Sequence, residues 1–295
     1  MDGDNISFDD SVSRRRALFG TTAALGSAFA LSVQPVQAQT MIVTPGDGII
    51  TGEVSIATKD GKQMRGYRAY PATGTGFATI LVTQEVFGVH VHIADMCRRF
   101  AKAGYYAIAP ELYFRQGDPQ NEATLEGLLK NIVNKVPDAQ VMSDMDSTVA
   151  FAARDGGKAD TSKLGITGFC WGGRIVWMYD AHNPAVKAGV AWYGPLVKDA
   201  TPLSPTNPID IVGQLHGPVQ GLYGGADTGI SQDSVNKMLA ALKASSNPAA
   251  QKSQIKVYPD TPHAFNADYR PSYRKAAADD GWQLCLAWFK ANGVV

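Results

Sequence analysis

Residues 163–180 read KLGITGFCWGGRIVWMYD, and this stretch decides the fold. Residues 163–169 predict a buried strand, and the apolar spacing after Cys170 predicts a helix. Between the two, Gly168-x-Cys170-x-Gly172 puts a cysteine on a sharp turn whose glycines let strand and helix approach closely. Such a unit is typical of a nucleophile elbow, which projects a reactive side chain from the carboxyl edge of a sheet, beside the positive end of a helix.

Strands and helices alternate along the chain on both sides of the elbow. This alternation predicts a mostly parallel sheet with helices on both faces, and with the elbow it predicts an α/β-hydrolase fold, a three-layer sandwich. Residues 115–137 are polar and predict a loop and a short helix over the site. Strands are expected at residues 53–57, 63–71, 79–83, 105–110, 163–169, 186–193, 219–223 and 255–258, and helices at 92–102, 139–154, 171–180, 231–244 and 272–292.

The composition favours a small-molecule substrate. The chain has 295 residues, of which 45 % are hydrophobic, and its 27 Lys and Arg are balanced by 27 Asp and Glu. No charge excess is available to attract nucleic acid or an anionic membrane, so neither is expected as a partner. The sequence has no CxxC pair and no GxGxxG motif after a strand, so no metal and no cofactor are expected. We expect a monomer or a small homo-oligomer.

The N-terminus predicts export. Arg14-Arg15-Arg16 precede an apolar run, and small residues follow near Ala38, which is the order of a bacterial secretory signal. The arginines resemble those of a twin-arginine signal. A membrane anchor is the alternative, but the apolar run is short and interrupted by Gly20 and Gly26. We expect residues 1–38 to be cleaved, and residues 39–295 to form one domain in the periplasm or outside the cell.

A cysteine nucleophile needs a base, and the base needs an acid that orients it. In this fold class the order along the chain is nucleophile, acid, histidine. Asp227 follows the strand at 219–223 and His263 follows the strand at 255–258, so both are expected at the carboxyl edge. Asp227 could also be a simple turn residue, and Cys170 a buried structural cysteine. The ordered triple nevertheless predicts Cys170, Asp227 and His263 as the catalytic residues.

The remaining cysteines and histidines are expected to play other parts. Cys97 and Cys285 occupy apolar helix positions, which predicts that both lie in the core. His92 is expected to start a helix, and His90 either lines the pocket or faces solvent. In this fold the oxyanion hole uses backbone N–H groups, for which we expect the N–H of Trp171, after the nucleophile, and that of Val86.

Taken together, the motifs resemble those of the dienelactone hydrolase family (carboxymethylenebutenolidases). The resemblance covers about residues 55–292, and the motifs occur in the family's order. They are Gln84-Glu85-Val86-Phe87-Gly88, Ala109-Pro110-Glu111-Leu112-Tyr113, Gly168-Phe169-Cys170-Trp171-Gly172-Gly173, Gly224-Gly225-Ala226-Asp227 and His263-Ala264-Phe265.

The resemblance implies further site residues. Glu85 matches the family glutamate that takes the proton of the nucleophilic thiol, and Arg115 matches an arginine that pairs with this glutamate and with the substrate carboxylate. A second family arginine lies four residues after the histidine, where this sequence has Ala267. Arg270, three residues further on, is the candidate to replace it. Tyr113 and Phe265 are candidates to line the substrate pocket.

The sequence therefore predicts a hydrolase that cleaves a lactone or a small carboxylic ester through a thioester on its cysteine. Two alternatives remain open, since a fold alone does not fix a function. One is a ligand-binding protein without catalytic activity on the same scaffold. The other is a thiol redox protein that uses an activated cysteine, although the chain lacks a CxxC pair.

Overall fold

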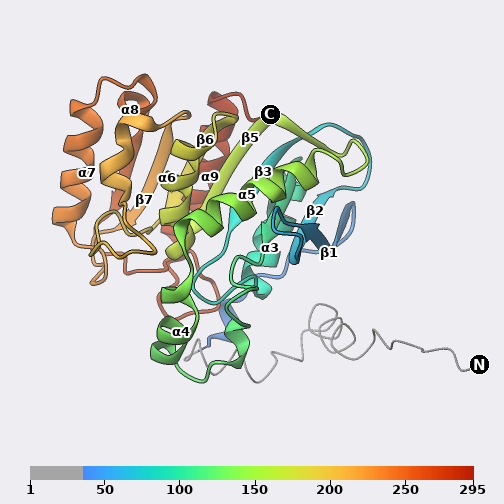
Figure 1. Ribbon diagram of the computed structural model, residues 1–295, viewed down its shortest axis with the longest axis horizontal. Helices are drawn as coiled ribbons and strands as arrows, with labels where there is room; N and C mark the ends of the chain where they lie inside the picture. The colour runs from blue at the N-terminus through green and yellow to red at the C-terminus, as the bar shows by residue number, and fades with distance from the viewer. Residues whose placement is uncertain (1–35) are drawn as a thin grey trace, which may run out of the picture.

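The computed structural model describes residues 36–295, and its centre is an eight-stranded sheet (Figure 1). The strand order is β1-β2-β4-β3-β5-β6-β7-β8. Strands β3 to β8 are parallel wherever they pair, whereas β2 runs antiparallel to both of its neighbours. The strands are β1 (Ile49–Ala57), β2 (Gln63–Pro71), β3 (Phe77–Thr83), β4 (Tyr106–Pro110), β5 (Ala159–Phe169), β6 (Val186–Trp192), β7 (Val219–Gly224) and β8 (Gln254–Tyr258).

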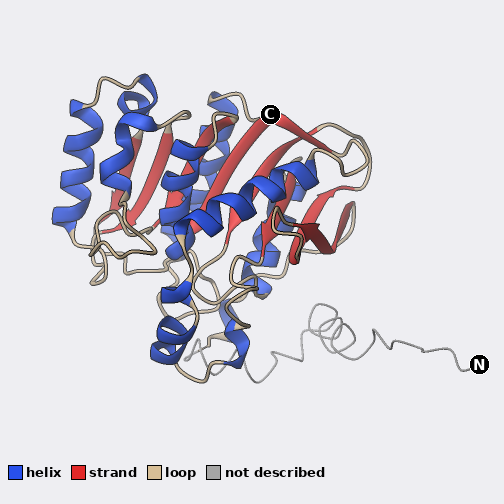
Figure 2. Ribbon diagram, viewed as in Figure 1, coloured by secondary structure: helices blue, strands red, loops and turns tan. Residues whose placement is uncertain are grey.

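Helices cover both faces of this sheet (Figure 2). Helices α5 (Asp138–Ala152) and α6 (Trp171–His182) lie on one face, and α3 (Val91–Lys102) and α9 (Lys275–Ala291) lie on the other. The ring of Phe100 in α3 joins the second pair, because its centroid lies 4.7 Å from that of Trp282 in α9. The predicted three-layer α/β-hydrolase fold is thus confirmed. No helix in the described part of the chain is long and apolar enough to cross a membrane.

The elements agree with those expected from the sequence, with a few differences. The hairpin of β1 and β2 is longer than expected at its first strand, and α8 (Pro248–Lys252) and a 3₁₀ helix at Pro208–Gln214 were not predicted. Both begin with a proline directly after a capping asparagine, which is a start signal that a short apolar pattern does not reveal. The predicted export signal at residues 1–38 lies almost entirely outside the described residues.

The parallel strands end at one edge of the sheet, and the long connections gather there. The connection from β4 to α5 holds α4 (Leu125–Asn131) and two short 3₁₀ turns, as the polar composition of residues 115–137 predicted. It projects beyond the strand ends (Figure 1). The connections after β3, β5, β7 and β8 start at the same edge, so residues far apart in the sequence meet there.

Asp180 gives the fold a distinctive dependence on pH. Its carboxyl group is buried at the end of α6, where Oδ1 accepts N–H groups of His216 and Gly217 at 3.0 and 3.1 Å. Burial outweighs these hydrogen bonds and raises the pKa to about 8. Because the folded pKa exceeds the unfolded one, the contribution of this group to stability is complete below about pH 4 and is lost as the pH rises through 8.

Asp180→Asn is therefore expected to remove this loss. The amide oxygen can still accept the two backbone N–H groups, and the side chain stays neutral at all pH values. At pH 9 we expect the variant to be more stable than the wild type by roughly 2 kcal/mol, or about 5 °C in Tm. Thermal melts at pH 6 and pH 9 test this, with Asp199→Asn at the surface as the control. If the Tm of Asp180→Asn fell as much between pH 6 and pH 9 as the Tm of the wild type, the prediction would be contradicted.

Candidate active site

The turn that carries Cys170 is strained and depends on its glycines. Cys170 has φ 54° and ψ −118°, in a region that non-glycine residues rarely adopt. A Cβ atom at Gly168 would overlap the hydroxyl of Thr83, and one at Gly172 would overlap the carbonyl oxygen of Gln84. The Cys170 N–H donates to the carbonyl of Trp192 at 3.0 Å, which fixes the turn to β6. The predicted nucleophile elbow is thus present, between β5 and α6.

Backbone strain is concentrated around this turn. Within residues 36–295, the non-glycine residues with positive φ are Cys170, Tyr193 and Ala264. Cys170 follows β5, Tyr193 follows β6, and Ala264 comes directly after His263. The rings of Tyr193 and His263 are also in contact, with centroids 5.1 Å apart. Strain of this kind persists where the surroundings enforce it, and it is typical of functional sites.

The structure brings Asp227 and His263 together. Asp227 Oδ2 lies 2.7 Å from His263 Nδ1, and Oδ1 accepts the N–H groups of Gly229 and Ile230 at 2.8 and 3.1 Å. The Asp227 side chain is fully buried, while that of His263 is 31 % exposed. The carboxylate is therefore fixed by the backbone of its own loop, and it orients the imidazole with Nε2 turned away from it.

Cys170 completes the constellation from the opposite side of the imidazole. Burial acts to lower the pKa of His263, but the hydrogen bonds with Asp227 and with Cys170 outweigh it and raise the pKa to about 10. An imidazolium at neutral pH stabilises a neighbouring thiolate, and the start of α6 does the same. The three predicted residues thus meet in one site, and the chemistry open to them is nucleophilic attack by sulfur.

The other two cysteines are confirmed as core residues. Cys97 in α3 and Cys285 in α9 are fully buried, and burial raises the pKa of both thiols. Neither lies at the carboxyl edge of the sheet. Cys170 is the partly accessible cysteine of the three.

Two backbone N–H groups lie where an oxyanion hole is expected. Trp171 is the first residue of α6, so its N–H has no partner within the helix. Val86 lies in the tight turn Glu85–Gly88, which is closed by a hydrogen bond from the Gly88 N–H to the Glu85 carbonyl. No acceptor within residues 36–295 takes the N–H of Trp171 or Val86. Both remain available to a developing negative charge.

Glu85 is buried beside this turn, in a cluster that the sequence did not reveal. Its Oε2 accepts the hydroxyl of Tyr269 at 2.6 Å and lies 3.1 Å from His90 Nε2. Burial acts to raise the pKa of Glu85, but its hydrogen bonds with His90 and Tyr269 hold the pKa below its usual range. His90 is buried in the site and does not face solvent, which was the other position considered for it. Tyr269 was not predicted as a site residue.

The two predicted substrate arginines lie in different settings. Arg115 does not pair with Glu85 as the family pattern implied, because two aspartates take its guanidinium. It contacts Asp144 at 2.5 and 2.9 Å and Asp60 at 2.8 and 3.0 Å. Arg270 is closer to the cluster: its guanidinium lies 5.6 Å from the centroid of the Phe87 ring, and its charge acts on His90 and Tyr269.

The predicted aromatic residues are both fully buried. The ring of Tyr113 contacts that of Trp171 at 4.9 Å between centroids, directly beside the elbow. Phe265 packs among Tyr193, Tyr258 and Trp192, with centroids 5.2 to 5.9 Å away. Phe265 therefore supports the loop that carries His263, and contact with a substrate remains a prediction for both residues.

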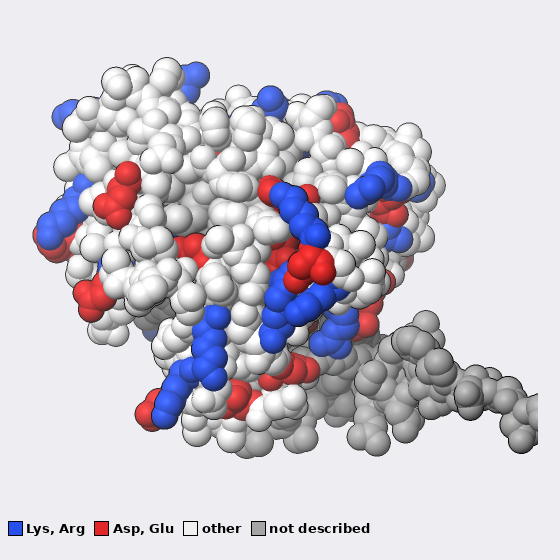
Figure 3. All heavy atoms as spheres, in the orientation of Figure 1, with Lys and Arg blue, Asp and Glu red and all other residues white. Residues whose placement is uncertain are grey.

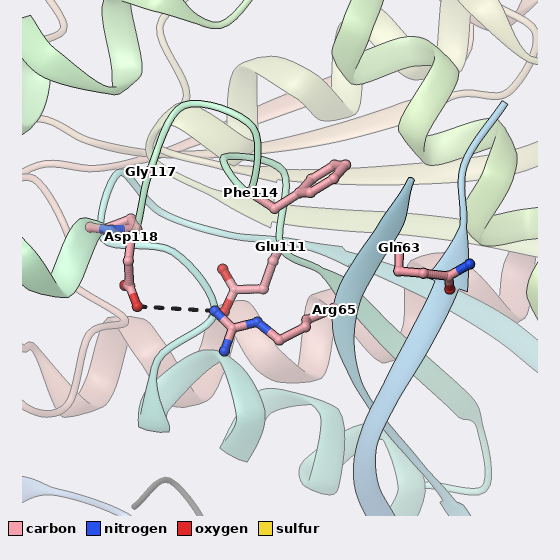
Figure 4. A pocket seen from close by; sticks show the side chains of 7 residues that line it. Gln63, Arg65, Glu111, Phe114, Gly117 and Asp118 are labelled. Atoms are coloured by element: carbon pink, nitrogen blue, oxygen red, sulfur yellow. Dashed lines mark ion pairs between the residues drawn. The ribbon is translucent and has the colours of Figure 1, made fainter. Parts of the chain in front are cut away.

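A cavity of about 320 Å³ lies to one side of these residues and contains none of the predicted triad. Arg65 and Glu111 point toward one another in it, and Asp118 lies 4.0 Å from Arg65 (Figure 4). Glu111 also accepts the Val89 N–H at 3.3 Å, so the cavity borders the loop that follows Glu85. The cavity is lined by Gln63, Arg65, Glu111, Phe114, Gly117, Asp118 and Pro119.

The charges on the molecule are mixed. On the face drawn in Figure 3, basic and acidic side chains alternate without a large patch of one sign, in line with the equal numbers of both in the sequence. Among the described residues, no group of three or more His, Cys, Asp or Glu side chains is arranged to hold a metal ion.

Known proteins are similar to this chain in both sequence and fold. The model of the dienelactone hydrolase family matches residues 64–293. A protein of Methylorubrum extorquens, provisionally named a carboxymethylenebutenolidase, is 56 % identical over 95 % of this chain and 94 % of its own length. A protein of Escherichia coli K12 with the same provisional name is 52 % identical over 90 % of this chain and 96 % of its own length.

A solved structure is also similar to this chain. The crystal structure of a provisionally named dienelactone hydrolase from Klebsiella pneumoniae is 52 % identical and has a TM-score of 0.79. The match covers 83 % of this chain and 99 % of that chain. A match of this extent in sequence and in fold, with the elbow and its partners at the carboxyl edge, shows that the chain belongs to the dienelactone hydrolase family.

Proposed function

We propose that this protein hydrolyses lactones or small carboxylic esters through a thioester on Cys170. The observation that carries the proposal is the Asp227–His263 hydrogen bond of 2.7 Å, with the thiol of Cys170 on the other side of the imidazole. The provisional names of the relatives point to the same class, since a butenolide is a lactone.

The reaction follows from these contacts. The thiol proton is held on His263, and the thiolate attacks the carbonyl carbon, whose π electrons move to the oxygen. When this intermediate collapses, the C–O bond breaks, and His263 returns the proton to the departing oxygen. His263 then removes a proton from water, which attacks the thioester and releases the acid, restoring Cys170. Asp227 keeps Nδ1 protonated throughout.

The oxyanion is stabilised by the backbone. Its negative charge forms beside the N–H groups of Val86 and Trp171, and each such donor is worth roughly 3 kcal/mol of barrier lowering. No metal or cofactor takes part in these steps. Glu85 remains a candidate to accept the thiol proton, as in the family pattern, but its hydrogen bonds with Tyr269 and His90 support a different role, argued below.

Trapping the acyl-enzyme tests the proposal. Purified protein is mixed with p-nitrophenyl acetate, stopped in acid within a second and weighed by intact-mass spectrometry, followed by peptide mapping. We expect one acetyl group per chain, located on Cys170, together with a burst of p-nitrophenol and continued turnover. No adduct and no turnover with this ester or with a dienelactone would reject the proposal and favour a binding protein. Oxidation of Cys170 by dilute peroxide without any ester turnover would favour a redox protein.

We also propose that residues 1–38 direct export and are then removed, so that residues 39–295 act outside the cytoplasm. The proposal is supported by the arginines before the apolar run and the small residues after it. Expression of the full chain in a bacterium, followed by fractionation and N-terminal sequencing, tests it. A chain that stays uncleaved in the cytoplasm would reject it, and replacing Arg14 and Arg15 with lysine is expected to block export.

A further inference from the structure

We propose that Tyr269 and His90 are positioning residues, which hold Glu85 as a fixed anion and thereby hold the turn that presents the Val86 N–H to the substrate. The inference rests on the proposed function, because it assigns a role in the same reaction. It differs from the family pattern, in which the glutamate moves and takes the thiol proton.

Glu85 is held from two sides. The hydroxyl of Tyr269 donates to Oε2 at 2.6 Å, and the ring of His90 lies 3.1 Å from the same oxygen. All three side chains are at least 97 % buried. Moving Glu85 toward the thiol would require both hydrogen bonds to break, which is costly for a buried carboxylate.

His90 is the donor in its contact with Glu85. His90 precedes α3, and its Nδ1 accepts the N–H of His92 at 3.3 Å as the cap of that helix. An imidazole that accepts at Nδ1 carries its proton at Nε2, so it donates to Glu85. Burial lowers the pKa of His90, which keeps the ring in this neutral form. A neutral histidine beside it leaves the charge of Glu85 in place.

Tyr269 is itself held in place. Its neighbour Asp268 pairs with Arg99 of α3 and lies 3.4 Å from His92. The hydroxyl of Thr40 donates to the carbonyl of Asp268, which holds the backbone next to Tyr269. The hydroxyl is thus delivered to Glu85 by a segment that is fixed at the backbone and at the preceding side chain.

The backbone links Glu85 to the proposed oxyanion hole. Val86 follows Glu85 directly, and the Gly88 N–H donates to the Glu85 carbonyl at 3.3 Å to close the turn. The His90 N–H donates to the Gly88 carbonyl at 3.1 Å, so the histidine that binds the side chain of Glu85 also ends the same turn. Fixing the carboxylate therefore fixes the direction of the Val86 N–H.

Tyr269→Phe tests this, because it removes one hydroxyl and keeps the ring. The matched control is Tyr273→Phe, a partly exposed tyrosine in the same loop. With p-nitrophenyl acetate we expect Tyr269→Phe to lower kcat by about 10-fold or more while KM stays within about 3-fold, as for a weakened oxyanion hole. The control is expected to behave as the wild type does. Glu85→Gln and His90→Asn are expected to lower kcat in the same way.

A second readout separates this role from proton transfer. The rate at which iodoacetamide alkylates Cys170 is measured across pH in the wild type, in Tyr269→Phe and in Glu85→Gln. We expect the three profiles to coincide, because Glu85 exchanges no proton with the thiol. A shifted profile in Glu85→Gln, or a kcat of Tyr269→Phe within two-fold of the wild type, would overturn the inference. A wild type that forms no acyl-enzyme would instead reject the proposed function, on which the inference rests.

Discussion

Cys170→Ala is expected to abolish ester turnover, with a loss of at least about 10⁴-fold in kcat and no acyl-enzyme detectable by mass. The side chain removed is the sulfur that forms the covalent bond, and neither serine nor threonine follows it in the turn to replace it. Alanine also keeps the Cβ atom that the strained turn already accommodates at φ 54°. We therefore expect Tm to change by no more than about 3 °C.

Cys97→Ala supplies the matched control for this variant. It removes a sulfur that is fully buried in α3, so it is expected to lower stability by leaving a small cavity while the acyl-enzyme still forms on Cys170. Full activity in Cys170→Ala would show that the nucleophile lies elsewhere. A loss of activity in Cys97→Ala at a temperature where the protein is folded would show that the assay reports on the fold and not on the thiol.

Much of this site could be predicted because its determinants are local. The spacing of glycines around Cys170 is dictated by atoms that almost touch, namely Gly168 against Thr83 and Gly172 against Gln84. A turn with such limits leaves a pattern in the sequence. Asp227 and His263 could be found because parallel strands end at one edge, so the residue order along the chain and the strand ends together determine which side chains meet.

The residues that were missed are held by contacts between distant parts of the chain. Tyr269 meets Glu85 across 184 residues of sequence, and no periodicity or turn chemistry marks a tyrosine in an irregular loop. The prediction that Arg115 pairs with Glu85 was wrong for a related reason. A motif can carry an arginine over from a family, but it does not show that Asp144 and Asp60 will compete for its guanidinium.

Asp227→Asn is expected to lower kcat by about 10³- to 10⁴-fold while the fold persists. The Asp227 Oδ1 accepts two backbone N–H groups, and the amide oxygen of asparagine takes over that place. The amide NH₂ then faces His263 Nδ1, which must become an acceptor. The imidazole proton moves to Nε2, on the side of Cys170, and the ring can no longer receive the thiol proton.

The pH dependence of thiol reactivity distinguishes this account from a simple loss of packing. In the wild type, Asp227 and Cys170 raise the pKa of His263 to about 10, so an imidazolium is present at neutral pH to stabilise the thiolate. Without the carboxylate this pKa falls, and alkylation of Cys170 by iodoacetamide at pH 7 is expected to slow and to recover only at higher pH. Asp260→Asn, at an exposed aspartate three residues before His263, should leave both kcat and the alkylation profile unchanged. An alkylation profile that stays the same in Asp227→Asn would mean that His263 does not govern the thiol, and the proposed order of proton transfers would have to be abandoned.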